Sequence, residues 1–193
     1  MTPLDAPLVN FGDIVRGNWP LTFAPKSSSI FSWLMNNYWG TNFPAWQGGD
    51  YTFRYEITSS ADFDAAALTR FGRSALTQFE HDDVAGSTEA STLPPTQASL
   101  LQVSAPDVSL LTWKLAEDGH GTILRLQETA GKTATATLHS DFVGFEKAWV
   151  TSILEDDERE VSAVSGDLSI HLKPFQVVTV RVQTVVRHRE QTR

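Results

Sequence analysis

The chain has 193 residues, a net charge of −8 with an isoelectric point near 5.0, and no cysteine. This length is enough for one large domain or two small ones, but a barrel enzyme of about 200 to 250 residues would not fit. The acidic balance argues against nucleic acid or an anionic membrane as a partner, because phosphate binding needs clustered Lys and Arg. The absence of cysteine excludes disulfides and thiol chemistry. Neither a signal peptide nor a membrane span is visible, which predicts a soluble protein; the compartment stays open, with the cytoplasm slightly favoured.

Residues 1–83 are predicted to form a β-rich segment with one short helix. The stretch 30–43 has enough apolar residues for a strand or a helix, and its aromatic enrichment favours a strand. In residues 51–58 apolar and polar side chains alternate, as in a half-buried strand.

The helix is predicted over residues 61–71. Its apolar side chains recur every four residues: Phe63, Ala67 and Phe71. Asp62 and Asp64 stand near its start, where a carboxylate favours the positive end of the helix dipole, and Gly72 is predicted to cap its end. A second helical turn over residues 74–79 is a weaker expectation.

Residues 84–97 are rich in Ser, Thr and Gly, contain a Pro-Pro pair, and are predicted to be a linker or a long surface loop. Residues 98–193 are predicted to form an immunoglobulin-like antiparallel β-sandwich, because short β-type segments alternate with turn signals about every ten residues. The predicted strands are 98–104, 107–115, 122–128, 132–139, 147–154, 167–172 and 175–186. The third and fourth are expected to pair as a hairpin. The fold class is therefore mainly β, with one short α-helix in the N-terminal half.

Aromatic and amide side chains are concentrated early in the chain, since four of the six tryptophans and all three tyrosines precede residue 56. Such rings either fill a core with their polar edges hydrogen-bonded or form a platform on which a sugar stacks, and core packing is the favoured interpretation. If a glycan site exists, Trp39 and Trp46 are the candidates for stacking. The candidate hydrogen-bonding residues are Asn36, Asn37, Asn42 and Asp50.

The sequence contains no recognisable pattern of metal ligands or of a catalytic nucleophile. The five histidines stand apart, without the close spacings typical of zinc ligands: His81, His120, His139, His171 and His188. No Ser-His-Asp arrangement or nucleotide-binding fingerprint is found. The sequence therefore predicts no catalytic residue and no metal ligand.

Several charged residues have a structural interpretation as the default. Asp5 and Asp13 are predicted to hold backbone amides in loops, with contact to a neighbouring domain as the alternative. Arg125 is expected to pair with an acid on an exposed face, or else to project toward a docked domain. The acidic run 156–160 is predicted to be a solvated turn.

Several segments resemble one family in the same order along the chain. The N-terminal ones are Asp5-Ala6-Pro7-Leu8-Val9, Gly12-Asp13-Ile14-x-Arg16-Gly17, Asn36-Asn37-Tyr38-Trp39-x-Thr41-Asn42, Phe53-Arg54-Tyr55 and Ala65-Ala66-Ala67-x-x-Arg70-Phe71-Gly72. The C-terminal ones are Ala116-Glu117-Asp118-Gly119, Ile123-Leu124-Arg125-Leu126-x-Glu128 and Leu172-x-Pro174-Phe175. Together they resemble the C-terminal β-domain region of bacterial α-mannosidases of glycoside hydrolase family 38, over roughly residues 3 to 182.

The resemblance implies a fold and a role. Residues 1–83 would correspond to the end of the mannosidase central β-sandwich. Enzymes of this family hydrolyse α-mannosides with a zinc ion and an aspartate nucleophile in an N-terminal catalytic domain, which has no counterpart in this chain. Zinc is therefore expected only in that absent domain, and no cofactor is expected here.

Two functional hypotheses follow. In the first, the chain is a non-catalytic module that supports or docks to the catalytic domain of an α-mannosidase, in the same or a separate chain. Such a module should expose an apolar patch in residues 7–19 and 30–43, which could also drive a homodimer. In the alternative, the chain is a free-standing carbohydrate-binding module that binds a mannose-containing glycan through the Trp/Tyr/Asn block.

Overall fold

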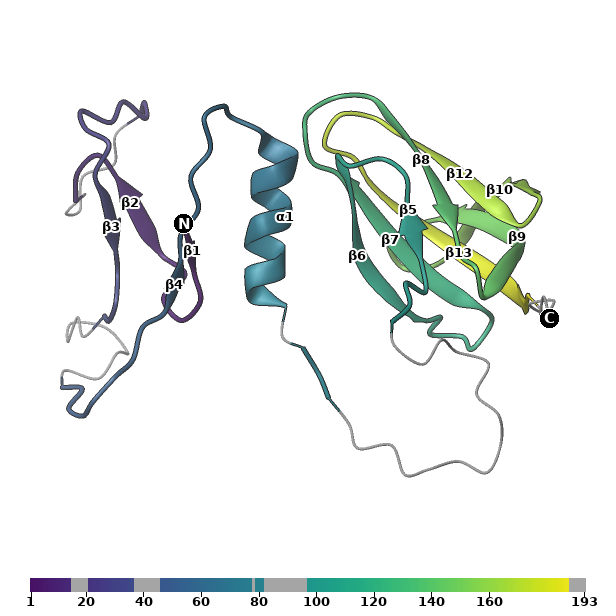
Figure 1. Ribbon diagram of the computed structural model, residues 1–193, viewed down its shortest axis with the longest axis horizontal. Helices are drawn as coiled ribbons and strands as arrows, with labels where there is room; N and C mark the ends of the chain where they lie inside the picture. Colours follow the sequence, from purple (N-terminus) through teal and green to yellow (C-terminus); the bar gives the residue numbers. More distant parts are fainter. Residues whose placement is uncertain (15–20, 37–45, 78, 82–96, 188–193) are drawn as a thin grey trace. The chain divides into compact units, whose positions relative to one another are not determined.

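The computed structural model describes residues 1–14, 21–36, 46–77, 79–81 and 97–187 (Figure 1). The chain divides into two compact units. Unit 1 comprises residues 1–62 and 71–79, and unit 2 comprises residues 63–70 and 80–193. Helix α1 (Ala65–Leu76) contributes residues to both units. The predicted class, mainly β with one helix in the N-terminal half, is confirmed.

Unit 1 is built from two small antiparallel ladders. Strand β1 (Thr2–Pro3) pairs with β4 (Tyr55–Glu56), and β2 (Val9–Phe11) pairs with β3 (Ile30–Ser32). The strands are shorter than predicted. β3 ends at Ser32, and part of the predicted strand 30–43 lies outside the described residues. β4 has two residues, whereas the predicted strand covered residues 51–58.

The helix begins and ends later than predicted. Asp64 acts as its N-cap, since its Oδ1 accepts a hydrogen bond from the backbone N–H of Ala67 at 2.9 Å. The prediction that Gly72 caps the C-terminus is wrong, because α1 continues to Leu76. A glycine inside a helix costs only about 1 kcal/mol relative to alanine, and the residues after Gly72 are compatible with helix, so the helix continues through it.

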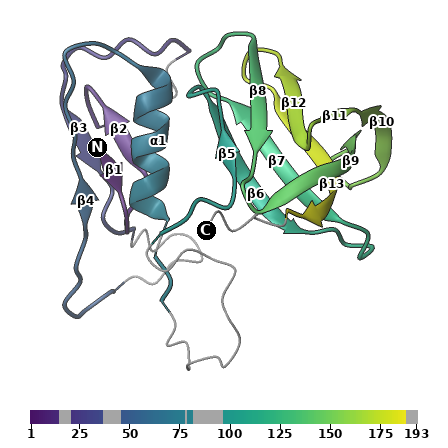
Figure 2. The same cartoon turned by 45° about the vertical axis from the view of Figure 1, so that its right-hand side comes forward.

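The rest of unit 2 is an antiparallel β-sandwich, whose two sheets Figure 2 shows face to face. The five-stranded sheet has the order β10 (Asp157–Val161), β9 (Val143–Thr151), β13 (Val177–Val186), β7 (Thr122–Glu128), β6 (Val108–Leu115). The four-stranded sheet has the order β11 (Ala163–Val164), β12 (Asp167–Leu172), β8 (Ala134–His139), β5 (Gln102–Val103). The β-sandwich prediction is confirmed for this part of the chain.

The core lies between these two sheets. It is filled by alternating side chains from both, among them Leu124 and Val180 from one sheet and Leu138 and Leu168 from the other, each at most 1% exposed. Burial at this level contributes roughly 1.5 to 3 kcal/mol for each large aliphatic side chain, so the core accounts for most of the stability of the sandwich.

The predicted hairpin between residues 122–128 and 132–139 is wrong. β7 pairs with β6 and β13, whereas β8 pairs with β12 and β5, so the chain crosses from one sheet to the other between them. Both strands have an apolar face directed into the same core, and both sides of β7 are already occupied by neighbours. The short connection therefore joins the two layers of the sandwich.

Strand boundaries elsewhere are close to those predicted, except that β5 covers only two residues of the predicted strand 98–104. Two strands were not predicted. β7 and β12 have the predicted bounds. β9 begins before residue 147, where the strand was predicted to begin, and ends before residue 154, where it was predicted to end. β11 was not predicted, and β10 lies in the acidic run that was predicted to be a turn. The β10 residues are mostly exposed, so their sequence lacks the apolar alternation from which a strand is predicted.

Candidate functional site

The exposed apolar surface around β2 and β3, which we name the apolar face of unit 1, is the first candidate site. It consists of large hydrophobic side chains on β2, β3 and the residues that adjoin them, all between 41% and 68% exposed: Leu8, Phe11, Ile14, Ile30, Trp33, Leu34 and Met35. The β2–β3 ladder gathers them on its two sides, because successive strand residues point to opposite faces. Phe11 lies opposite Ile30 on one side, and Leu8, whose carbonyl accepts from the backbone N–H of Trp33 at 3.0 Å, lies with Trp33 on the other. An open depression is lined by Ile14 and by residues 30–35.

Polar groups around this face are satisfied within unit 1. The indole N–H of Trp33 donates to the side-chain oxygen of Asn10, and the Tyr55 hydroxyl donates to Ser32 Oγ at 2.8 Å. Asp5 accepts hydrogen bonds from the backbone N–H and guanidinium of Arg54, at 2.7 and 2.8 Å. Hydrogen bonds from Arg54 hold the pKa of the Asp5 carboxyl below its ordinary value, so the predicted structural role of Asp5 is confirmed.

Unit 1 has almost no core of its own. Among its described residues, Ala6 is the one hydrophobic residue that is buried, while the hydrophobic cluster of the protein lies within residues 101–182. Two-stranded ladders are at best marginally stable in water without a surface to pack on. The exposed apolar face is therefore what a partner surface would have to cover.

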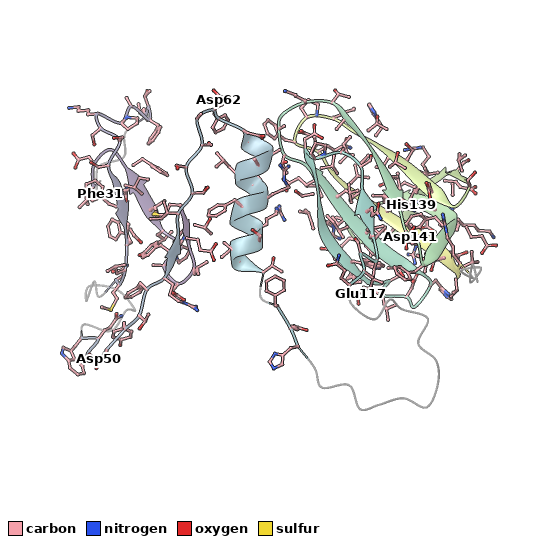
Figure 3. All side chains as sticks on the ribbon, in the orientation of Figure 1. Phe31, Asp50, Asp62, Glu117, His139 and Asp141 are labelled. Carbon is pink, nitrogen blue, oxygen red and sulfur yellow. The ribbon has the colours of Figure 1, made fainter. Side chains whose placement is uncertain are left out.

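The glycan candidates are only partly described. Trp39, Asn37 and Asn42 lie outside the described residues. Trp46 is 82% exposed, so at this position the favoured core interpretation is wrong. Asn36 and Asp50 are also exposed, and the Asn36 carbonyl accepts a hydrogen bond from Gln47 Nε2 at 3.1 Å. Figure 3 labels Asp50 in the loop between β3 and β4.

A charged cluster that the sequence did not predict lies on the outer face of the five-stranded sheet. Arg181 on β13 is 6% exposed. Its guanidinium binds Asp157 and Asp118, both at 2.8 Å, and donates to the carbonyls of His120 and Glu155. It therefore joins β13 to β10 and to the loops before β7 and β10. Arg181 stands between two valines along the chain, and this position does not predict these partners.

A second part of this cluster surrounds Glu155, which is 7% exposed and has a positive φ of 74°. Its carboxylate accepts hydrogen bonds from Lys114 Nζ at 2.7 Å and from the backbone N–H of Glu117 at 2.8 Å. Glu117, labelled in Figure 3, also pairs with Lys114. These bonds hold the loop 152–156 against the sheet.

Arg125 contributes to the same anchorage in a way that differs from the prediction. In the part of the chain that the structure describes, it donates to the Thr179 hydroxyl at 3.2 Å and to the Ile153 carbonyl at 3.3 Å. The expected surface ion pair of Arg125 with an acid is therefore wrong for the described part of the chain, where the partners of its Nε and Nη2 are a hydroxyl and a carbonyl.

The electrostatics of the cluster favour a structural role over proton transfer. The side-chain hydrogen bond from Arg181 lowers the pKa of Asp118, and that from Lys114 lowers the pKa of Glu155. Both carboxyls are then ionised at neutral pH and cannot act as a general acid, which requires a raised pKa. The cluster holds loops on a sheet.

Two further observations bound the chemistry. Within the described ranges, no group of three or more His, Cys, Asp or Glu side chains is arranged to hold a metal ion. Over the same ranges, the helix is too short and too polar to cross a membrane.

Comparison with known proteins agrees with the sandwich geometry. A search of curated proteins gave no match. Residues 107–180, which run from the start of β6 into β13, match the family model of the glycosyl hydrolases family 38 C-terminal beta sandwich domain. The resemblance to family 38 is thus confirmed for this stretch, which is similar to the C-terminal β-sandwich domain of that family.

Proposed function

We propose that the chain is a non-catalytic module of an α-mannosidase-like glycoside hydrolase, which supports a zinc-dependent catalytic domain in the same or a separate chain. The observation that carries this proposal is the match of residues 107–180 to the family 38 C-terminal sandwich domain. The charged cluster of the sandwich fits a supporting role, because its bonds hold loops and lower the pKa values of Asp118 and Glu155.

The apolar face of unit 1 is the proposed docking surface for the catalytic domain. Its large side chains are exposed, and among the residues of unit 1 that the structure describes Ala6 is the one buried hydrophobic residue. Burying these side chains at about 25 cal/mol per Å² would stabilise both unit 1 and the assembly.

The docking experiment titrates the chain into a separately purified family 38 catalytic domain from the same genome and measures heat of binding. The double variant Phe11→Ser/Leu34→Ser should weaken binding at least tenfold, because both side chains are about half exposed on the apolar face. Val164→Ser is the control, since Val164 is a 72% exposed hydrophobic residue on β11 of the sandwich.

Equal weakening by the control and the double variant would contradict docking through this face. Light scattering of the chain alone tests the homodimer as a second occupant of the same surface. A dimer that the double variant dissociates, together with no heat of binding to the catalytic domain, would assign the apolar face to self-association.

Catalysis by the chain alone gives a second test. The purified chain should hydrolyse no aryl α-mannoside and should contain no stoichiometric zinc, because we expect the zinc site and the nucleophile in the catalytic domain. Turnover that survives purification and is abolished by a chelator would overturn the proposal.

Glycan binding is the second candidate function, and the exposure of Trp46 is the observation that favours it. An exposed indole can stack on the apolar face of a sugar ring, with Asn36 and Asp50 as candidate hydrogen-bonding groups. Mannose oligosaccharides titrated into the parent chain and into Trp46→Ala test it. Binding heat in the parent that disappears in a folded variant would support it, whereas no heat in the parent would leave Trp46 without this role.

A further inference from the structure

A compact cluster of ionisable side chains lies at one edge of the sandwich, outside the surfaces described above. His139 is the last residue of β8, and Asp167 is the first residue of β12. His139 Nδ1 lies 2.8 Å from Asp167 Oδ1, and its Nε2 lies 3.3 Å from Asp141 Oδ1. Figure 3 shows the labelled His139 and Asp141 at this edge.

Arg187 brings the other sheet into the cluster. It follows β13 of the five-stranded sheet, and its Nη2 donates to Asp167 Oδ1 at 3.0 Å and to the Ser165 carbonyl at 3.2 Å. Its backbone N–H donates to the Phe142 carbonyl at 2.8 Å. Asp167 belongs to the four-stranded sheet, so its bond to Arg187 connects the two sheets directly.

The approach of Arg187 depends on a glycine. Gly166 has φ +78°, and a Cβ atom at that position would lie 2.6 Å from Arg187 Nη2. The local backbone is thus shaped to let the guanidinium reach Asp167.

The protonation state of His139 determines how many of these bonds can form. A neutral imidazole has one N–H, so it can donate to only one of the two carboxylates, whereas an imidazolium donates to both. Protonation of His139 places a positive charge between the carboxylates of Asp141 and Asp167. The β5 residue opposite His139 is Gln102, which is uncharged.

We propose that His139, Asp141 and Asp167 form a pH-sensitive latch that holds the end of β8 against the start of β12 when His139 is protonated. The latch strengthens on acidification and loosens as the imidazole loses its proton. The bond of Arg187 to Asp167 connects this edge to the five-stranded sheet and does not require the proton of His139.

The direction of the pKa shifts agrees with this geometry. Hydrogen bonds from His139 to Asp167 and Asp141 raise the pKa of His139 above its ordinary value, and the bond with His139 lowers the pKa of Asp167. A raised histidine pKa gives stability that is complete below the unfolded-state value of about 6.5 and is lost as pH rises through the higher folded-state value. A lowered aspartate pKa gives stability that is lost only as pH falls through that lower value.

The test measures thermal unfolding and backbone hydrogen exchange of the whole chain from about pH 5 to about pH 9, a range that brackets histidine titration. In the parent, stability and protection of the backbone amides at the paired ends of β8 and β12, around Leu138 and Leu168, should fall as pH rises. His139→Gln should remove this fall. His171→Gln is the matched control, because His171 lies on the same sheet and its Nδ1 hydrogen-bonds to the Thr135 hydroxyl; it should keep the pH dependence of the parent.

Direct titration of the imidazole keeps the proposal testable if the variant folds poorly. The His139 ring followed by NMR in the parent chain should titrate above about 6.5. A midpoint at or below that value would overturn the latch. The same pH dependence in the parent and in His139→Gln would also overturn it.

Discussion

At the scale of single residues, Glu128 connects two turns through one carboxylate. Its side chain is fully buried, and it accepts hydrogen bonds from the backbone N–H groups of Ala130, Gly131 and Phe175 at 2.7 to 2.9 Å. Burial alone would raise the pKa of this carboxyl, but the backbone hydrogen bonds outweigh it and hold the pKa below its ordinary value. The turn after β7 and the turn before β13 therefore depend on the same side chain.

Replacing Glu128 by Gln should lower the melting temperature by about 5 °C or more, because an amide NH2 would face backbone donors that need an acceptor. Differential scanning calorimetry measures the change. Glu146→Gln is the control, since Glu146 is exposed on β9 and should change the melting temperature little. Equal melting temperatures for Glu128→Gln and the parent would show that the turns do not depend on this carboxylate.

Arg181 is the second residue whose loss should be severe. Arg181→Met would leave Asp118, Asp157 and two carbonyls without their donor, and should reduce the free energy of unfolding by about 2 to 4 kcal/mol. Urea denaturation measures this. Arg159→Met, at an exposed position on β10, should stay within about 0.5 kcal/mol of the parent.

Limited proteolysis adds a local readout for Arg181→Met. Cleavage in the loops 116–121 and 152–156 should accelerate, because the guanidinium bonds both loops. Unchanged cleavage of these loops would contradict loop anchoring by Arg181, even if the variant has a lower free energy of unfolding.

At the scale of elements, α1 shows which local signals are sufficient. The side chain of Asp64 caps the N-terminus of the helix. Asp64→Ala should therefore reduce the free energy of unfolding by about 1 kcal/mol. Denaturant unfolding followed by circular dichroism measures the change. Asp62→Ala is the control, since Asp62 contributes its backbone carbonyl to the hydrogen bond with Ser60. A similar loss in both variants would contradict side-chain capping by Asp64.

The sequence predicts where these strands lie better than it predicts which strands pair with each other. The alternation in residues 122–128 and 167–172 predicts β7 and β12 with their bounds, because a half-buried strand must alternate. Partner choice depends on which sheet each apolar face joins, and the same alternation suits either layer. The wrong hairpin between β7 and β8 follows from this ambiguity.

At the scale of the whole molecule, the distribution of buried hydrophobic residues predicts unequal local stability. Backbone amides of β2 and β3 should exchange with solvent at least about 100-fold faster than those of β7 and β13, because core burial is concentrated in the sandwich. Hydrogen exchange of the isolated chain tests this. Comparable protection in both units would mean that unit 1 is stabilised without a core or a partner.

The sequence by itself determined the β-sandwich, the presence of one helix and the resemblance to family 38, because apolar periodicity, capping residues and local segments are properties of neighbouring residues. It also directed attention to residues 7–19 and 30–43, whose described large hydrophobic residues are mostly exposed. Only the tertiary structure decided the partners of Arg181, Glu128 and His139. Arg181 lies 24 positions from Asp157 and 63 positions from Asp118 in the sequence, and His139 lies 28 positions from Asp167. Such pairs form where strands from different parts of the chain meet, and no periodicity of the sequence encodes which distant carboxylate will lie opposite a given cation.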